Sequence, residues 1–274
     1  MELKTVVIAP TAPHTHTVVF LHGRGGHANS FSRGLTLSRD SRKRNLYEAF
    51  PFFRWVFPQA PVRRLANGGF HLPQWFDTWS PADFTEHEEI QIPGLQEVVP
   101  AIRQILASEA AQLGGCWDKV ILAGISMGGA TSAHTMFNLA IPPPPHESTI
   151  ASKGLGALLT FSSRCPFAGR SLDEMRAVLC LPDTPDNAEV LQNTPMLLEH
   201  CVDDHLVPID TGRALRDTML RFGAQVTWKE YPHGGHWIHS PTGVDDVVAF
   251  FEKTLVQGDR GGNREHCSLS DGEA

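Results

Sequence analysis

Apolar segments alternate along the chain with stretches that have the spacing of amphipathic helices. Apolar or alternating segments at 17–21, 55–57, 120–123, 155–161, 196–200 and 225–231 are predicted as strands. Apolar residues three or four positions apart predict helices over 95–113, 210–222 and 245–255. Alternation of this kind predicts an α/β fold with a mainly parallel central sheet and helices on both faces.

Proline and glycine positions refine this outline. Pro100 interrupts the pattern of the first helix, and either marks its first turn or kinks it. The prolines at 142–145 predict a rigid surface loop, and Gly223 ends the second helix. Because no internal repeat or linker is evident, we expect one domain over residues 1–257. Residues 258–274 are polar and glycine-rich, which is typical of a disordered tail.

Composition and charge narrow the classes of partner. Hydrophobic residues make up 41% and charged residues 19% of the chain, as in globular domains with a full core. The formal net charge of −7 argues against nucleic acid as a partner, and the basic cluster at 38–44 is interpreted as a solvated loop or helix face. Residues 1–5 lack the start of a signal peptide, and no apolar run has transmembrane length. We therefore expect a cytoplasmic protein with at most peripheral membrane contact.

The segment 124–128 contains the strongest candidate for a nucleophile. It reads Gly-Ile-Ser-Met-Gly, which matches the pattern G-x-S-x-G. It follows a predicted strand and precedes small residues that can open a helix. A strand, a sharp turn and a helix are the setting in which this motif exposes its serine hydroxyl. The pattern predicts Ser126 as the nucleophile.

A serine nucleophile needs a base, and the base needs a group that orients it. Two adjacent carboxylates follow the strand at 196–200, and we favour Asp204 over Asp203 as the acid. Two histidines follow the strand at 225–231, and we favour His236, after a glycine pair, over His233. The resulting order of serine, acid and histidine is that of α/β hydrolases.

Hydrolysis of an acyl group also needs donors for the negative oxygen of the tetrahedral intermediate. One expected donor is the backbone N–H of Met127, the residue after the nucleophile. The glycine-rich segment 22–27 follows the first predicted strand and can approach a ligand closely. We assign the second donor to the N–H of Arg24.

Several motifs together resemble the acyl-protein thioesterase and carboxylesterase family of α/β hydrolases, also called the phospholipase/carboxylesterase family. The resemblance extends from about residue 18 to residue 255. It includes Phe-Leu-His-Gly at 20–23, Pro-Gln-Ala-Pro at 58–61, Trp-Phe-Asp at 75–77, the serine motif, and the segments 200–208 and 231–236. Alignment of the last two segments with the family's pattern also selects Asp204 and His236.

Some positions differ from the family's usual residues. Met127 stands where glutamine is usual, and Cys201 stands where glycine is usual. Arg164, in the segment Ser-Ser-Arg-Cys-Pro, replaces an aromatic residue that would border the acyl site. Trp75, Phe76 and Arg164 are the candidate substrate-binding residues, and we expect the aromatic segment 70–92 to form either an acyl-chain wall or ordinary core.

The resemblance implies a serine hydrolase that cleaves carboxylic esters or thioesters through an acyl-enzyme. Palmitoylated protein is the first expected substrate class, and small-molecule or lipid esters are the alternative. No cofactor is expected. A metallohydrolase using His14 and His16 is disfavoured, because the sequence contains no zinc-binding motif. A hydrolase-fold binding protein without activity is disfavoured, because all three catalytic residue types are present.

Overall fold

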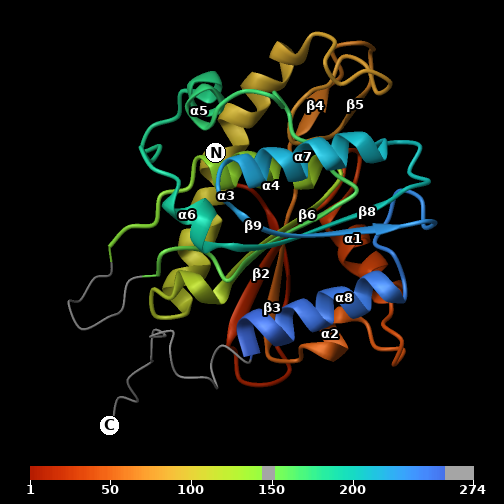
Figure 1. Ribbon diagram of the computed structural model, residues 1–274, viewed down its shortest axis with the longest axis vertical. Coiled ribbons are helices and arrows are strands. Elements are labelled where there is room, and N and C mark those ends of the chain that lie inside the picture. Colours follow the sequence, from red (N-terminus) through yellow and green to blue (C-terminus); the bar gives the residue numbers. More distant parts are fainter. Residues whose placement is uncertain (144–151, 257–274) are drawn as a thin grey trace.

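The computed structural model describes residues 1–143 and 152–256. Its centre is a seven-stranded sheet with the order β1-β3-β2-β6-β7-β8-β9 (Figure 1). All neighbouring strands pair in parallel except β1, which runs antiparallel to β3 at the edge. The strands are β1 (Thr5–Ile8), β2 (His16–Leu21), β3 (Phe53–Pro58), β6 (Val120–Ile125), β7 (Ala157–Phe161), β8 (Pro195–Cys201) and β9 (Gln225–Tyr231).

Helices cover both faces of the sheet, as Figure 1 shows. Alternate residues of each inner strand point to opposite faces, so that Val19 and Leu21 join one buried cluster while Val18 and Phe20 join the other. On the first face lie α3 (Gln91–Gln112), α4 (Met127–Phe137), α5 (Leu172–Leu179), α6 (Glu189–Asn193) and α7 (Ile209–Arg221). On the second lie α1 (Ala28–Gly34), α2 (Leu46–Ala49) and α8 (Thr242–Phe251). The predicted fold class is therefore confirmed.

Shorter elements complete the described chain. β4 (Val62–Arg64) and β5 (His71–Pro73) form an antiparallel hairpin. Single helical turns lie at η1 (Leu35–Leu37), η2 (Glu88–Ile90) and η3 (Trp117–Lys119). A π-helical turn, η4 (Glu252–Val256), extends α8.

The six predicted strands and three predicted helices all form, with shifted ends. α3 begins at Gln91, so Pro100 lies inside the helix and not in its first turn. The sequence did not indicate β1, whose four residues alternate between exposed and partly buried. Part of the predicted loop at 142–145, and the predicted tail at 258–274, lie outside the described residues. We propose one domain for residues 1–257, because the strands of a single seven-stranded sheet are distributed along the chain from residue 5 to residue 231.

Helix α4 packs against the ends of strands β2 and β6 with almost no space between the backbones. A Cβ atom at Gly128 would lie 2.3 Å from the carbonyl oxygen of Leu21 and 2.6 Å from that of His22. A Cβ atom at Gly124 would lie 2.4 Å from the backbone of Gly128. Real Cβ atoms do not approach backbone this closely, so the crossing requires glycine at both positions.

We expect Gly128→Ala to lower the free energy of unfolding by at least about 2 kcal/mol, because the added methyl group forces the backbone of β2 away from α4. Urea denaturation measures this difference. Gly69→Ala is the matched control, since a Cβ atom there meets nothing within 4 Å. A loss at Gly128 no greater than that at Gly69 would contradict the close crossing.

Candidate active site

Ser126 lies at the turn between β6 and α4 and has a strained backbone. Its φ of 57° and ψ of −124° lie outside the regions that a non-glycine residue normally adopts. Such a conformation costs on the order of 1–3 kcal/mol and persists only where neighbouring contacts enforce it. Here the Ser126 N–H donates to the carbonyl of Phe161 at 2.9 Å, and the Ser163 hydroxyl donates to the Ser126 carbonyl at 2.9 Å. These contacts hold the serine at the carboxyl end of the sheet.

The loop after β2 lies directly beside this serine. A Cβ atom at Gly23 would be 3.3 Å from the Cβ of Ser126. The Gly26 N–H closes a turn on the Gly23 carbonyl at 3.1 Å. Within the described chain, the N–H groups of Arg24 and Met127 donate to no other protein group, and both residues line the same cavity. Two amide hydrogens are thus available close to the serine.

His22 fixes the shape of that loop. Its Nε2 accepts the Ala60 N–H at 3.1 Å, so the ring proton is on Nδ1, which donates to the Gly23 carbonyl at 2.7 Å. Burial lowers the pKa of His22, which keeps the ring neutral and this arrangement stable. The indole N–H of Trp75 donates to the His22 carbonyl at 2.7 Å.

Asp204 and His236 form a hydrogen-bonded pair. The His236 Nδ1 lies 2.8 Å from Oδ2 of Asp204. The other carboxylate oxygen accepts the N–H groups of Leu206 and Val207 at 2.9 Å each. Burial raises the pKa of Asp204, but hydrogen bonds from His200, His236 and the Val207 N–H outweigh it and hold the pKa well below its ordinary value. An ionised carboxylate therefore orients the His236 ring.

Asp203 and His233, the alternatives from the sequence, occupy different positions. Asp203 accepts the N–H groups of Gly235 at 2.8 Å and Gly234 at 3.3 Å, and so shapes the loop that holds His236. The His233 side chain is 90% exposed and lies 3.8 Å from Asp203. Neither residue lines the cavity.

A cavity of about 540 Å³ connects the candidate residues. Ser126, Met127, Arg24, His236 and Arg164 all contribute to its lining, while Asp204 lies behind His236. The volume is within the range of small-molecule sites, roughly 300–1,000 Å³. The structure therefore brings together the predicted nucleophile, base and oxyanion donors at one site.

The sequence matches the phospholipase/carboxylesterase family over residues 3–168, which is more than half of the chain. The chain belongs to this family. It is an α/β hydrolase and an enzyme that hydrolyses carboxylic esters.

Individual relatives of this carboxylesterase-family enzyme are distant but extend over most of its length. The acyl-protein thioesterase 1 of Schizosaccharomyces pombe is 26% identical over 208 residues, which cover 76% of this chain and 76% of that protein. The protein of the same name from Gibberella zeae is 26% identical over 258 residues, covering 93% of this chain and 97% of that protein. The crystal structure of Zea mays acyl-protein thioesterase 2 has a TM-score of 0.68 at 25% identity, covering 92% of this chain and 99% of that one.

Trp75 and Phe76 do not lie where substrate-binding residues were expected in this esterase. Both side chains are completely buried and neither lines the cavity. Trp75 holds the loop at His22, and the Phe76 ring centroid lies 5.6 Å from the guanidinium carbon of Arg164. They support cavity residues from behind, and the segment 70–92 contributes only Thr78, Pro81 and Phe84 to the wall.

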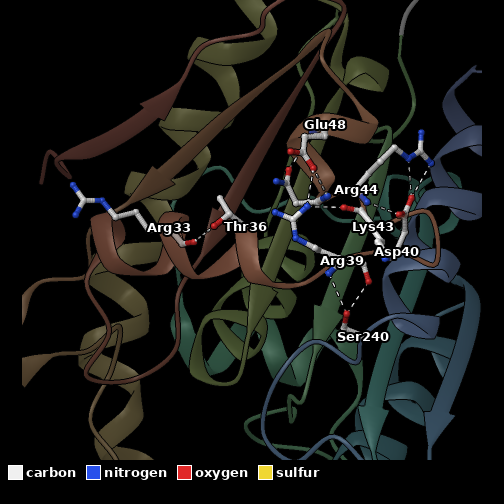
Figure 2. Close-up of polar contacts among 9 residues, drawn as sticks. Arg33, Thr36, Arg39, Asp40, Lys43, Arg44, Glu48 and Ser240 are labelled. Carbon is white, nitrogen blue, oxygen red and sulfur yellow. Dashed lines mark hydrogen bonds and ion pairs between the residues drawn. The ribbon is translucent and has the colours of Figure 1, made fainter.

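The basic segment at 38–44 also has a role that the sequence did not indicate. The Trp237 indole N–H donates to the Ser38 hydroxyl at 2.9 Å. The Ser240 hydroxyl donates to the Arg39 carbonyl at 2.7 Å and accepts the Arg39 N–H at 3.0 Å (Figure 2). This segment therefore braces the loop that presents His236.

Internal ion pairs keep the brace in shape. The Asp40 carboxylate pairs with Arg44 at 2.8 Å, and the Arg39 guanidinium lies 3.3 Å from the Glu48 carboxylate (Figure 2). The Arg44 N–H also donates to Asp40 at 2.7 Å. The predicted solvated loop is confirmed, since residues 41–43 form an exposed turn. The contacts of this loop add a structural role that the sequence did not indicate.

Residues 1–143 and 152–256 contain neither a candidate membrane-spanning helix nor a candidate metal site. None of the helices there combines the length and apolar character that crossing a bilayer requires. No group of three or more histidine, cysteine, aspartate or glutamate side chains there has an arrangement that could hold a metal ion.

We expect Asp204→Asn to lower kcat for ester hydrolysis by about 10⁴-fold, because the amide favours the wrong tautomer of His236. Asp203→Asn, the matched control one residue away, should cost less than about tenfold, since Asp203 contacts backbone N–H groups and the exposed His233 but not His236. Steady-state kinetics on an aryl ester measure both values. Equal losses for the two variants would contradict the assignment of Asp204.

The stability difference between the wild type and Asp204→Asn should depend on pH. Because the pKa of Asp204 in the folded protein lies below its ordinary 3.8, the ionised carboxylate stabilises the fold above pH ~4. That contribution is lost as the pH falls further and the carboxylate takes up a proton. Urea denaturation from pH 7 to pH 3 should show a constant difference above pH ~5 and a shrinking one below pH ~4. A difference that does not shrink would disprove the stabilising role of the charge.

Proposed function

We propose that Ser126, His236 and Asp204 form the catalytic triad of a serine hydrolase that cleaves carboxylic esters and thioesters through an acyl-enzyme. The observation that supports this most strongly is the 2.8 Å contact between His236 and an ionised Asp204, with His236 and the strained Ser126 lining one cavity. A serine hydroxyl needs an oriented base of this kind to become a nucleophile.

The reaction begins with attack of the Ser126 Oγ on the acyl carbonyl carbon. His236 accepts the hydroxyl proton on Nε2, and Asp204 stabilises the resulting imidazolium through Nδ1. Collapse of the tetrahedral intermediate breaks the bond to the alcohol or thiol, which takes the proton from His236. Water then attacks the acyl-enzyme, with His236 again as base, and releases the carboxylic acid and free Ser126.

The N–H groups of Arg24 and Met127 stabilise the negative oxygen of each tetrahedral intermediate. The available donors and the close approach of Gly23 to Ser126 support this role. Only the backbone of Met127 is used, so that the departure from glutamine at this position leaves the chemistry intact. Loss of one such donor typically lowers kcat by about 10²–10³-fold.

The name acyl-protein thioesterase, which several relatives carry, supports a thioester-acylated protein as the first substrate class. We propose the cytoplasm as the location, as expected from the sequence. One observation favours a second candidate, a carboxylesterase acting on small polar esters: the cavity contains the buried guanidinium of Arg164. The two candidates share the Ser126 chemistry and differ in the acyl group and the alcohol or thiol released.

We expect a fluorophosphonate probe to label the wild-type enzyme and Ser30→Ala but not Ser126→Ala. Ser30 is the matched control because it is a serine that also lines the cavity. Ser126→Ala should lower kcat on an aryl ester by about 10⁴-fold or more. Labelling of Ser126→Ala at the wild-type rate would disprove the proposed nucleophile. Wild-type rates on an S-palmitoyl peptide, a lysophospholipid and a short aryl ester then decide between the two substrate classes.

A further inference from the structure

Arg164 is a buried cation inside the candidate active site. It lies in the loop after β7 and is only 6% exposed, yet it lines the cavity that holds Ser126. Its Nη2 donates to the side-chain oxygen of Gln91 at 2.8 Å, and its guanidinium carbon lies 4.2 Å from the centroid of the Phe84 ring. Among the described residues, Nε and Nη1 have no hydrogen-bond partner and no carboxylate lies within ion-pair distance. Neither nitrogen is among the fully buried side-chain atoms without a partner, so both have accessible surface on which a ligand can be met.

The nearest acid does not fill this role. Glu88 interacts with Arg164 only at longer range, and its carboxylate accepts the N–H of Phe167. Burial raises the pKa of Glu88, although that N–H and the charge of Arg164 oppose the rise. Glu88 is not part of the cavity wall. Glu88 therefore lies outside the cavity and partly offsets the positive charge of Arg164. The Nε and Nη1 donors of Arg164 stay free for a ligand.

The charge of the cavity is opposite to that of the whole protein. The chain has a formal net charge of −7, yet the cavity lining contains two arginines and no aspartate or glutamate. The second arginine, Arg24, is partly satisfied, since its Nε donates to Gln74 at 2.9 Å and its Nη2 lies 4.0 Å from Asp77. Arg164 is therefore the main unneutralised charge that a ligand meets.

We propose that Arg164 forms a subsite for a carboxylate at the far end of the acyl group, so that the enzyme prefers half-esters or half-thioesters of dicarboxylic acids. A guanidinium presents two parallel N–H donors that match a carboxylate. The inference rests on the proposed function and specifies its acyl group.

The position of Arg164 assigns the anion to the acyl half of the substrate. The leaving group takes its proton from His236, which lies beside Leu206 and Trp237 in the cavity wall. Leu206 is 65% exposed and marks the open side of the cavity, through which an alcohol or thiol departs. Arg164 is instead buried and follows Ser163, whose hydroxyl holds the backbone of Ser126. The acyl group, which stays attached to Ser126 during the reaction, is therefore the part of the substrate that reaches Arg164.

The test compares two aryl esters that differ only in the charge at the end of the acyl chain. The 4-nitrophenyl monoester of suberic acid and 4-nitrophenyl octanoate have the same chain length and leaving group. We expect the wild type to have the higher kcat/KM on the suberate. Arg164→Met should lower kcat/KM on the suberate by about 10- to 100-fold, as for loss of a hydrogen-bonded charge, and leave the octanoate rate unchanged or raised.

Arg64→Met is the control, since Arg64 is an exposed arginine of β4 away from the cavity lining and should change neither rate. Product inhibition of the wild type needs no variant: free suberate should inhibit at lower concentration than octanoate. Equal inhibition by the two acids would overturn the proposal even if Arg164→Met fails to fold. Equal loss on both esters in a folded Arg164→Met would show a structural role and would also overturn it.

Three further outcomes separate a failure of the subsite from a failure of the proposed function. If Arg164→Met instead lowers kcat/KM only on an ester that carries its carboxylate on the leaving alcohol, the assignment of the anion to the acyl half is wrong. If Ser126-dependent hydrolysis of both esters occurs without a preference for suberate, the subsite fails while the proposed function stands. If neither ester is hydrolysed in a Ser126-dependent way, the proposed function itself fails.

Discussion

The rest of the site depends on the close approach of three backbones around Ser126. The loop after β2, the end of β6 and the start of α4 meet where even a methyl group would overlap backbone atoms at Gly124 and Gly128. This contact forces the left-handed φ of Ser126 and points the amides of Arg24 and Met127 toward one cavity. A strained residue persists only because the packed sheet beneath it cannot relax. The geometry for acyl transfer is thus present before any substrate binds.

The remaining groups reach the site because parallel strands end at the same edge of the sheet. The loops after β2, β6, β8 and β9 supply the oxyanion donors, the serine, the acid and the histidine. Three of these loops are held by a partner distant in sequence: Trp75 at His22, Phe161 at Ser126, and the segment 38–44 at the loop of His236. Buried hydrogen bonds of this kind fix positions at the cost of desolvation, which suits a site that must not reorganise during the reaction.

The sequence predicted the inner strands and the candidate triad for a physical reason. A strand covered on both faces must be apolar, and the turn after β6 tolerates only glycine two residues before and two residues after its serine. Both requirements leave local patterns in the sequence. The sequence did not indicate β1, because a short edge strand has only a half-buried pattern. It placed Trp75 and Phe76 in the wrong layer, because aromatic residues suit a cavity wall and the core behind it equally well. The support from Ser163 and Ser38 left no local signal, since each acts on a residue 37 or 199 positions away.

The brace between 38–44 and the loop of His236 joins segments that leave the ribosome far apart in time. A nascent chain that has just completed α4 lacks Phe161 and Ser163, which hold the strained serine turn, and it contains neither the histidine nor the acid. Trp237 and Ser240 are synthesised about 200 residues after the segment that receives them. Competence for acyl transfer therefore arises only after Ser240 has been synthesised, and a product terminated earlier carries an inert serine.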